Sequence, residues 1–139
     1  MKMRVFVDTA PFIYLIEKHP EFVDSIKWYF TELYTEKAEL LTSVITLSEF
    51  GVGPNKKGKP ELVQQFEEFI EKIGVKMVNV NRDHAKLSSK LRSEYQFLKG
   101  MDSLQIAMAQ LENCDHFLTN DIKLSKIQEI KVVLVKDLE

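Results

Sequence analysis

Met3-Arg4-Val5-Phe6-Val7-Asp8-Thr9 is the stretch on which the predicted fold depends. Its short apolar run ends at an acidic residue, which is typical of a buried strand with a carboxylate at its C-terminal tip. In open α/β sheets, ligands bind in the crevice beyond the carboxyl ends of the strands. Asp8 is therefore the first candidate for a functional residue.

The remainder of the chain alternates between strand and helix patterns. Further strands are predicted over residues 39–43, 76–80, 116–119 and 131–135. Helices are predicted over residues 9–17, 21–36, from 43 or 46 onward, 60–73, 82–97, from 101 or 102 onward, and 122–126, with a loop over 53–60. This alternation predicts an α/β fold with a mainly parallel sheet and helices on both faces.

Length and composition are those of one ordinary globular domain. The chain has 139 residues, of which 45% are hydrophobic and 29% charged. No segment approaches the ~20 apolar residues of a membrane helix, and no signal peptide is visible. The single cysteine, Cys114, has no partner for an intramolecular disulfide, which fits a reducing cytoplasm.

Three more acidic residues stand near the edge of the sheet where Asp8 is expected. Asp121 follows the predicted strand 116–119, and Asp102 opens the helix that precedes this strand. Glu49 lies about two turns into the helix after the second strand. All four carboxylates could therefore meet at one rim.

Each of these residues also has a purely structural explanation. The three aspartates could be helix N-caps, and Glu49 could close a capping box with Thr46. Their joint occurrence favours a shared site, because unrelated caps have no reason to follow the strand order so closely.

Four converging carboxylates would require a counterion. Two of them about 4 Å apart repel by roughly 4 kcal/mol at an effective dielectric constant of 20. Hard oxygen ligands suit Mg²⁺ or Mn²⁺, which usually serve phosphate chemistry. A zinc cluster is not indicated, because the cysteine and the three histidines are scattered along the chain.

Net charge does not decide the substrate class. The formal charge of −2 argues weakly against nucleic-acid binding. With four of the 21 acidic residues set aside for a metal, 17 remain against 19 basic ones. The charge therefore neither supports nor excludes a phosphate-bearing substrate.

Four segments resemble the motifs of PIN-domain nucleases, most closely the VapC-type toxins of VapBC toxin–antitoxin pairs. These segments are Val5–Thr9, Ser48–Phe50, Met101–Ala107 and Leu118–Asp121. Each is weak alone, but all four in order are fairly specific. The resemblance implies a single PIN-like domain over residues 1–139, a three-layer α/β/α fold with a five-stranded parallel sheet, and Mg²⁺- or Mn²⁺-dependent endoribonuclease activity.

The resemblance also implies roles for individual residues and partners. The implied catalytic and metal-binding residues are Asp8, Glu49, Asp102 and Asp121, and the implied orienting residues are Thr9 and Asn120. Thr9 is equally well explained as a helix cap, and Asn120 as a turn residue. A homodimer and an antitoxin that covers the site are also implied, with the aromatic-rich helix over 22–34 as part of that contact.

Other functions fit the sequence less well. An aspartyl phosphatase usually has a second Asp two residues after the first, where this chain has Ala10, and a serine hydrolase would need a Gly-x-Ser-x-Gly elbow. A non-catalytic PIN-like binding module is expected to lack an acidic position. A stand-alone RNA-processing nuclease would lack an antitoxin-like reading frame beside its gene.

Overall fold

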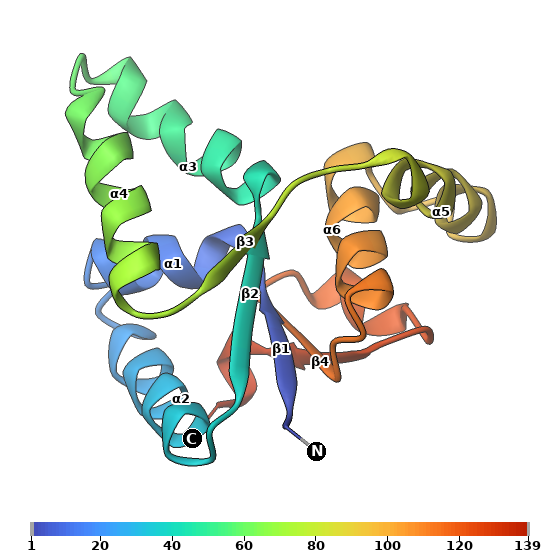
Figure 1. The fold of residues 1–139 in the computed structure, drawn as a ribbon, viewed down its shortest axis with the longest axis horizontal. Coiled ribbons are helices and arrows are strands. Elements are labelled where there is room, and N and C mark those ends of the chain that lie inside the picture. Colours follow the sequence, from blue (N-terminus) through green and yellow to red (C-terminus); the bar gives the residue numbers. More distant parts are fainter. Residues whose placement is uncertain (1, 139) are drawn as a thin grey trace.

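Residues 2–138 are described by the computed structural model, and their strands form one parallel sheet (Figure 1). The strands are β1 (Arg4–Val7), β2 (Glu39–Ser43), β3 (Lys76–Val78), β4 (His116–Thr119) and β5 (Lys131–Leu134). Their order is β3-β2-β1-β4-β5, and every neighbouring pair is parallel. The predicted five-stranded parallel sheet is confirmed.

Helices cover both faces of this sheet. They are α1 (Thr9–Ile16), α2 (Val23–Thr35), α3 (Val44–Lys56), α4 (Glu61–Lys72), α5 (Arg82–Glu94), α6 (Gly100–Leu111) and the 3₁₀ turns η1 (Ile122–Lys126) and η2 (Val135–Asp137). Figure 1 shows α1, α2 and α4 on one side, α5 and α6 on the other, and α3 rising from the carboxyl end of β2. The predicted α/β/α layering is confirmed. Within residues 2–138, no helix has the length and apolarity needed to cross a membrane.

The alternation of β1 side chains creates two cores. Successive strand residues point to opposite faces, so Val5 and Val7 pack with Phe12 on the α1 side. Phe6 packs on the α6 side, where its ring stacks on Phe117 with centroids 5.4 Å apart. All five side chains are fully buried. β1 is therefore fixed on both faces.

The topology reverses at β1, and this reversal defines the crevice. The chain runs from β1 outward to β2 and β3, then crosses to β4 on the other side of β1. Ligands in open α/β sheets bind where the strand order reverses. Asp8 follows β1 at this point, and its N–H donates to the Leu118 carbonyl of β4 at 2.9 Å.

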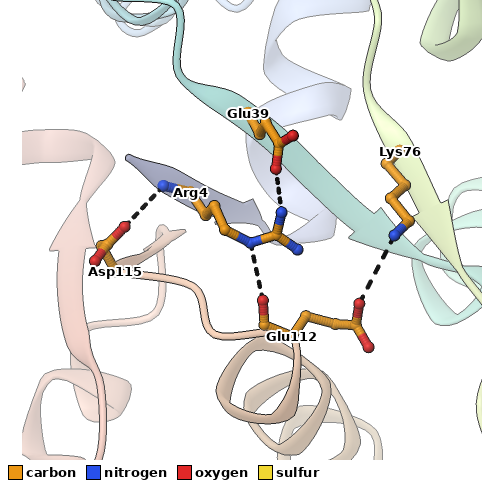
Figure 2. Close-up of polar contacts among 5 residues, drawn as sticks. All are labelled: Arg4, Glu39, Lys76, Glu112 and Asp115. Atoms are coloured by element: carbon orange, nitrogen blue, oxygen red, sulfur yellow. Dashed lines mark hydrogen bonds and ion pairs between the residues drawn. The ribbon is translucent and has the colours of Figure 1, made fainter. Parts of the chain in front are cut away.

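The opposite end of the sheet carries a network of paired charges (Figure 2). Arg4 donates its backbone N–H to Asp115 at 2.8 Å and its Nε–H to the Glu112 carbonyl at 2.9 Å, and its guanidinium pairs with Glu39. Lys76 lies 3.9 Å from the other end of Glu112. The amino ends of β1, β2 and β3 are thereby joined to the end of α6.

The predicted loop over 53–60 is wrong for residues 53–56, because α3 continues to Lys56 with Pro54 inside it. Packing against α4 stabilises the helical conformation of α3 through its glycines and proline. Phe50 stacks on Phe66 with ring centroids 4.0 Å apart, and Gly51 lies against Val63. Only the short turn before α4 remains non-helical.

Other boundaries also differ from prediction. The helix expected over 82–97 ends at Glu94, because Tyr95 turns to an extended conformation and its hydroxyl bonds to Glu129 at 2.6 Å. The helix expected to begin at 101 or 102 begins slightly earlier, at Gly100. β3 is two residues shorter than predicted, since the chain leaves the sheet before Asn81 caps α5.

The stacked pair at the sheet centre should carry much of the stability. Phe117→Ala is expected to lower the free energy of unfolding by about 3–5 kcal/mol, because a buried ring is replaced by a cavity. Val52→Ala, at a side chain 51% exposed, is the control and should change it by less than about 0.5 kcal/mol. Urea unfolding measures both, and a small loss for Phe117→Ala would contradict this account of the core.

Candidate functional site

Asp8 sits at the C-terminal tip of β1 and also caps α1. It is only 9% exposed. Its Oδ1 accepts the Thr9 N–H at 2.8 Å, and its Oδ2 accepts the Thr119 hydroxyl at 2.8 Å. Burial raises the pKa of Asp8 to about 6, and the negative charges of Asp102 and Glu49 act in the same direction, while the two hydrogen bonds oppose the rise.

Glu49 reaches the same region from α3. It is half-buried, and its Oε1 accepts the Thr9 hydroxyl at 2.6 Å. The capping box with Thr46 is wrong, because α3 begins earlier, with Ser43 as its N-cap accepting the Ile45 N–H at 3.0 Å. Glu49 therefore points into the site without a capping role.

Asp102 and Asp121 complete the acidic region. Asp102 lies in the first turn of α6, and the N-cap is Lys99, so the capping explanation is wrong for Asp102. Burial raises its pKa, Asp121 and Glu49 raise it further, and Lys99 opposes them. Asp121 is exposed and does cap η1, since its Oδ1 accepts the Lys123 N–H at 3.0 Å.

The charges of neighbouring acidic side chains thus act on the pKa of both Asp8 and Asp102. Asp8 is affected by Asp102 and Glu49, and Asp102 by Asp121 and Glu49. Over residues 2–138, however, no three His, Cys, Asp or Glu side chains are grouped closely enough to hold one ion. Mg²⁺ needs no such cage, because it is commonly held by one or two carboxylates with water completing its shell. The donor set fits this ion.

The two expected orienting residues behave differently. Thr9 contacts the site directly, because its hydroxyl bonds to Glu49 and lies 3.2 Å from the Thr46 hydroxyl. Asn120 instead donates its amide to the Tyr14 hydroxyl at 2.7 Å, which joins the end of β4 to α1. Its amide hydrogen bond therefore stabilises the packing of β4 against α1 and does not contact the four carboxylates.

Sequence reasoning missed several buried polar residues behind the carboxylates. Thr119 bonds Asp8 and also accepts the Asp121 N–H at 3.1 Å, so one hydroxyl serves two of the acids. Gln105 and Thr46 lie further in, each no more than 1% exposed. Polar residues at the ends of predicted buried strands or within an apolar helix face were the available signal.

An apolar groove opens beside the acidic region. It has a volume of about 630 Å³ and lies between α1, α3 and α4. Ile13, Leu62 and Phe69 are among its apolar lining, and its charged lining is Glu17, Glu49 and Lys57. The groove therefore meets the acidic region at Glu49.

Comparison with known proteins identifies the family. Residues 5–130 match the PIN domain family. The chain belongs to this family. The predicted resemblance to PIN domains is confirmed, and the site described above lies within the matched residues. A search of curated protein sequences found no significant match.

Solved structures share the fold of this PIN domain along nearly its whole length. VapBC2 from Rickettsia felis, bound to a promoter DNA fragment, contains a chain 25% identical with a TM-score of 0.76, over 95% of this chain and 98% of that chain. A toxin–antitoxin complex from Klebsiella pneumoniae gives 26% identity, a TM-score of 0.72, and coverages of 94% and 97%. The expected similarity to VapC-type chains is thereby confirmed.

A more distant likeness concerns the fold alone. VapC20 from Mycobacterium tuberculosis, a toxin that cleaves the sarcin–ricin loop, is 15% identical. Its TM-score is 0.67, over 91% of this chain and 98% of that chain.

Stability should fall as pH rises through the raised pKa of Asp8. The folded protein holds this proton up to about pH 6, whereas the ordinary value is 3.8. Between these values the folded state binds more protons than the unfolded state, so the free energy of unfolding decreases with increasing pH. The expected loss is up to about 3 kcal/mol, and Asp102 adds to it in the same direction.

Denaturant titrations in EDTA from pH 4 to pH 7 measure this loss. Asp8→Asn should flatten the profile and raise the stability at pH 7, because Asn still caps α1 but carries no charge. If both Asp8→Asn and Asp102→Asn clearly lower stability at pH 7, the carboxylates act mainly as structural groups.

Proposed function

We propose that this PIN-domain protein is a Mg²⁺- or Mn²⁺-dependent endoribonuclease and the toxin of a toxin–antitoxin pair. The observation that supports this proposal best is the set of mutually interacting carboxylates at the carboxyl ends of β1 and β4. In a PIN domain with an intact acidic set, hydrolysis of a phosphodiester is the chemistry that such a set can serve. We place the activity in the cytoplasm.

The surroundings of each carboxylate indicate whether it would hold the ion or orient the attacking water. Asp8, Asp102 and Asp121 would hold the ion, which when bound supplies positive charge to the phosphate undergoing displacement. Asp8 is the most firmly held, because Thr9 and Thr119 fix both of its oxygens. Burial keeps bulk water from competing for this carboxylate.

Glu49 is suited to handling the attacking water. Its Oε1 is engaged by the Thr9 hydroxyl at 2.6 Å. That bond sets the direction of the carboxylate and leaves Oε2 to orient a water molecule or to hold its proton. Glu49 could instead contribute to holding the ion, and both roles need the same position.

The groove beside Glu49 supports the proposal of a protein partner. VapBC2 from Rickettsia felis and the Klebsiella pneumoniae chain are toxin–antitoxin structures. An apolar segment of an antitoxin would bury the groove lined by Leu62 and Phe69 and reach the acidic region. Helix α2 exposes Trp28 and Tyr34, which suits a further contact with the antitoxin or with a second copy in a homodimer.

Two alternative functions can be distinguished from the proposed one. A non-catalytic binding module would not need Asp8 to stay buried and charged, which is an energetic cost that a purely structural residue could avoid. A stand-alone RNA-processing nuclease would show the same chemistry but no dedicated protein partner.

Metal-dependent RNA cleavage is the first test. The protein should cleave RNA with Mg²⁺ or Mn²⁺ and lose activity in EDTA. Asp8→Asn and Asp102→Asn should each reduce cleavage by about 10²-fold or more, because the charge that holds the ion is lost. Asp115→Asn is the matched control, since Asp115 pairs with Arg4 at the opposite end of the sheet.

Cleavage is followed on gels with labelled RNA. Activity that persists in EDTA, or that survives both site substitutions, would contradict the proposed metal mechanism. A loss of activity in Asp115→Asn as large as in Asp8→Asn would point to misfolding.

Partner binding is the second test. The product of a small reading frame beside the gene should bind this chain and inhibit cleavage. Leu62→Glu should weaken that binding by more than tenfold, which is about 1.4 kcal/mol, because it puts a charge in the apolar groove. Glu61→Gln, at an exposed neighbouring position, should bind normally. Calorimetry measures both, and equal affinities would remove the groove from the proposal.

A further inference from the structure

We propose that Gln105 is a positioning residue of the acidic site, which orients Asp8 and the hydroxyl groups leading to Glu49 and so sets the affinity for a divalent ion. The inference rests on the proposed function for the ion, but its contacts are properties of this chain. Gln105 lies in α6, one turn after Asp102, and is 1% exposed.

Both ends of the Gln105 amide are engaged by site residues. Its Nε2 donates to the Thr46 hydroxyl at 2.8 Å and points to Asp8 Oδ1 at 3.4 Å, the longer and weaker of the two contacts. Its Oε1 accepts the Ser43 hydroxyl. An amide has two N–H donors and a carbonyl acceptor, so this side chain uses both of its ends within the site.

Ser43 fixes which way the amide faces. As the N-cap of α3, its Oγ accepts the Ile45 N–H at 3.0 Å. Its own proton remains free and is donated to Gln105 Oε1. If the amide were reversed, its carbonyl oxygen would face the carboxylate of Asp8. An ionised carboxylate has no proton to donate, so two acceptors would then face each other. The N–H groups of Gln105 are therefore held toward Asp8 and Thr46.

Thr46 extends the connection to the second carboxylate. Its Oγ lies 3.2 Å from the Thr9 hydroxyl, which bonds to Glu49, and 2.9 Å from the Thr42 hydroxyl. A nitrogen donor such as Gln105 Nε2 cannot reverse its bond, so the Thr46 oxygen must accept from it. The single Thr46 proton can then go to Thr9 or to Thr42, and when it goes to Thr9, Asp8 and Glu49 are joined through Gln105, Thr46 and Thr9.

This connection has a consequence for ion binding. Thr9 and Thr119 each hold one oxygen of Asp8, and Gln105 adds a contact that couples the orientation of Asp8 to Thr46 of α3. Hydrogen-bond partners that orient metal-binding side chains typically change ion affinity or activity 10–100-fold when removed. A buried amide that served only the core would affect stability and leave ion affinity unchanged.

The test compares two glutamines of the same helix in the full-length protein. Gln105→Met keeps the length and removes the amide. Gln110→Met is the matched control, because Gln110 is half-buried and its Oε1 has no hydrogen-bond partner within residues 2–138. The measurements are the Mn²⁺ dissociation constant by calorimetry, the kcat and KM of RNA cleavage, and the unfolding transition.

Gln105→Met is expected to weaken Mn²⁺ binding by about tenfold or more and to lower kcat with little change in KM. Gln110→Met should bind Mn²⁺ as the unaltered protein does. Unchanged Mn²⁺ affinity in Gln105→Met, with only a loss of stability, would overturn the inference. If Gln105→Met fails to fold, Ser43→Ala, which removes the donor that holds Gln105 Oε1, should weaken Mn²⁺ binding in the same direction, and unchanged affinity would overturn the inference.

A metal-independent measurement separates this inference from the proposed function. If the unaltered protein neither binds Mn²⁺ nor cleaves RNA, the proposed function fails. The side-chain N–H resonances of Gln105 then decide the contacts alone. They should exchange slowly with solvent and shift in Asp8→Asn, whereas rapid exchange and no shift would show that the amide does not hold Asp8.

Discussion

The structure depends on hydrogen bonds that offset the energetic cost of burying the Asp8 carboxylate. Asp8 follows the most enclosed strand of the sheet, with Val5, Phe6 and Val7 buried on both faces. A charged group in that position is unfavourable unless donors surround it. The neighbouring strand contributes Thr119 and the first turn of α1 contributes Thr9. The contacts that hold β1 in the fold therefore also position the residues of the acidic site.

The two ends of the sheet treat charge in opposite ways. At the amino ends, Arg4 pairs with Glu39 and Lys76 pairs with Glu112, so these two carboxylates have basic partners (Figure 2). At the carboxyl ends, burial and neighbouring acidic groups raise the pKa of Asp8 and of Asp102, and Lys99 lowers that of Asp102. The first end stabilises the fold, and the second retains an excess of negative charge that a cation can neutralise.

Local patterns were sufficient for the architecture, because each strand is a short apolar run and each helix has a stripe at helical spacing. They were insufficient where packing overrides local preference. α3 passes through Gly53 and Pro54 because Phe50 and Gly51 pack against α4. The four acidic positions followed from strand order. Gln105 and Thr46 did not, because a polar residue in a buried face acquires its partners only when distant segments meet.

One carboxylate performs two tasks at the tip of β1, since Asp8 begins α1 and also belongs to the acidic region. Asparagine begins a helix about as well as aspartate, whereas alanine does not. A lineage released from selection for activity could therefore drift to asparagine at this position with little harm to the fold. The residue found there in natural variants would record whether selection preserved the helix alone or the chemistry as well.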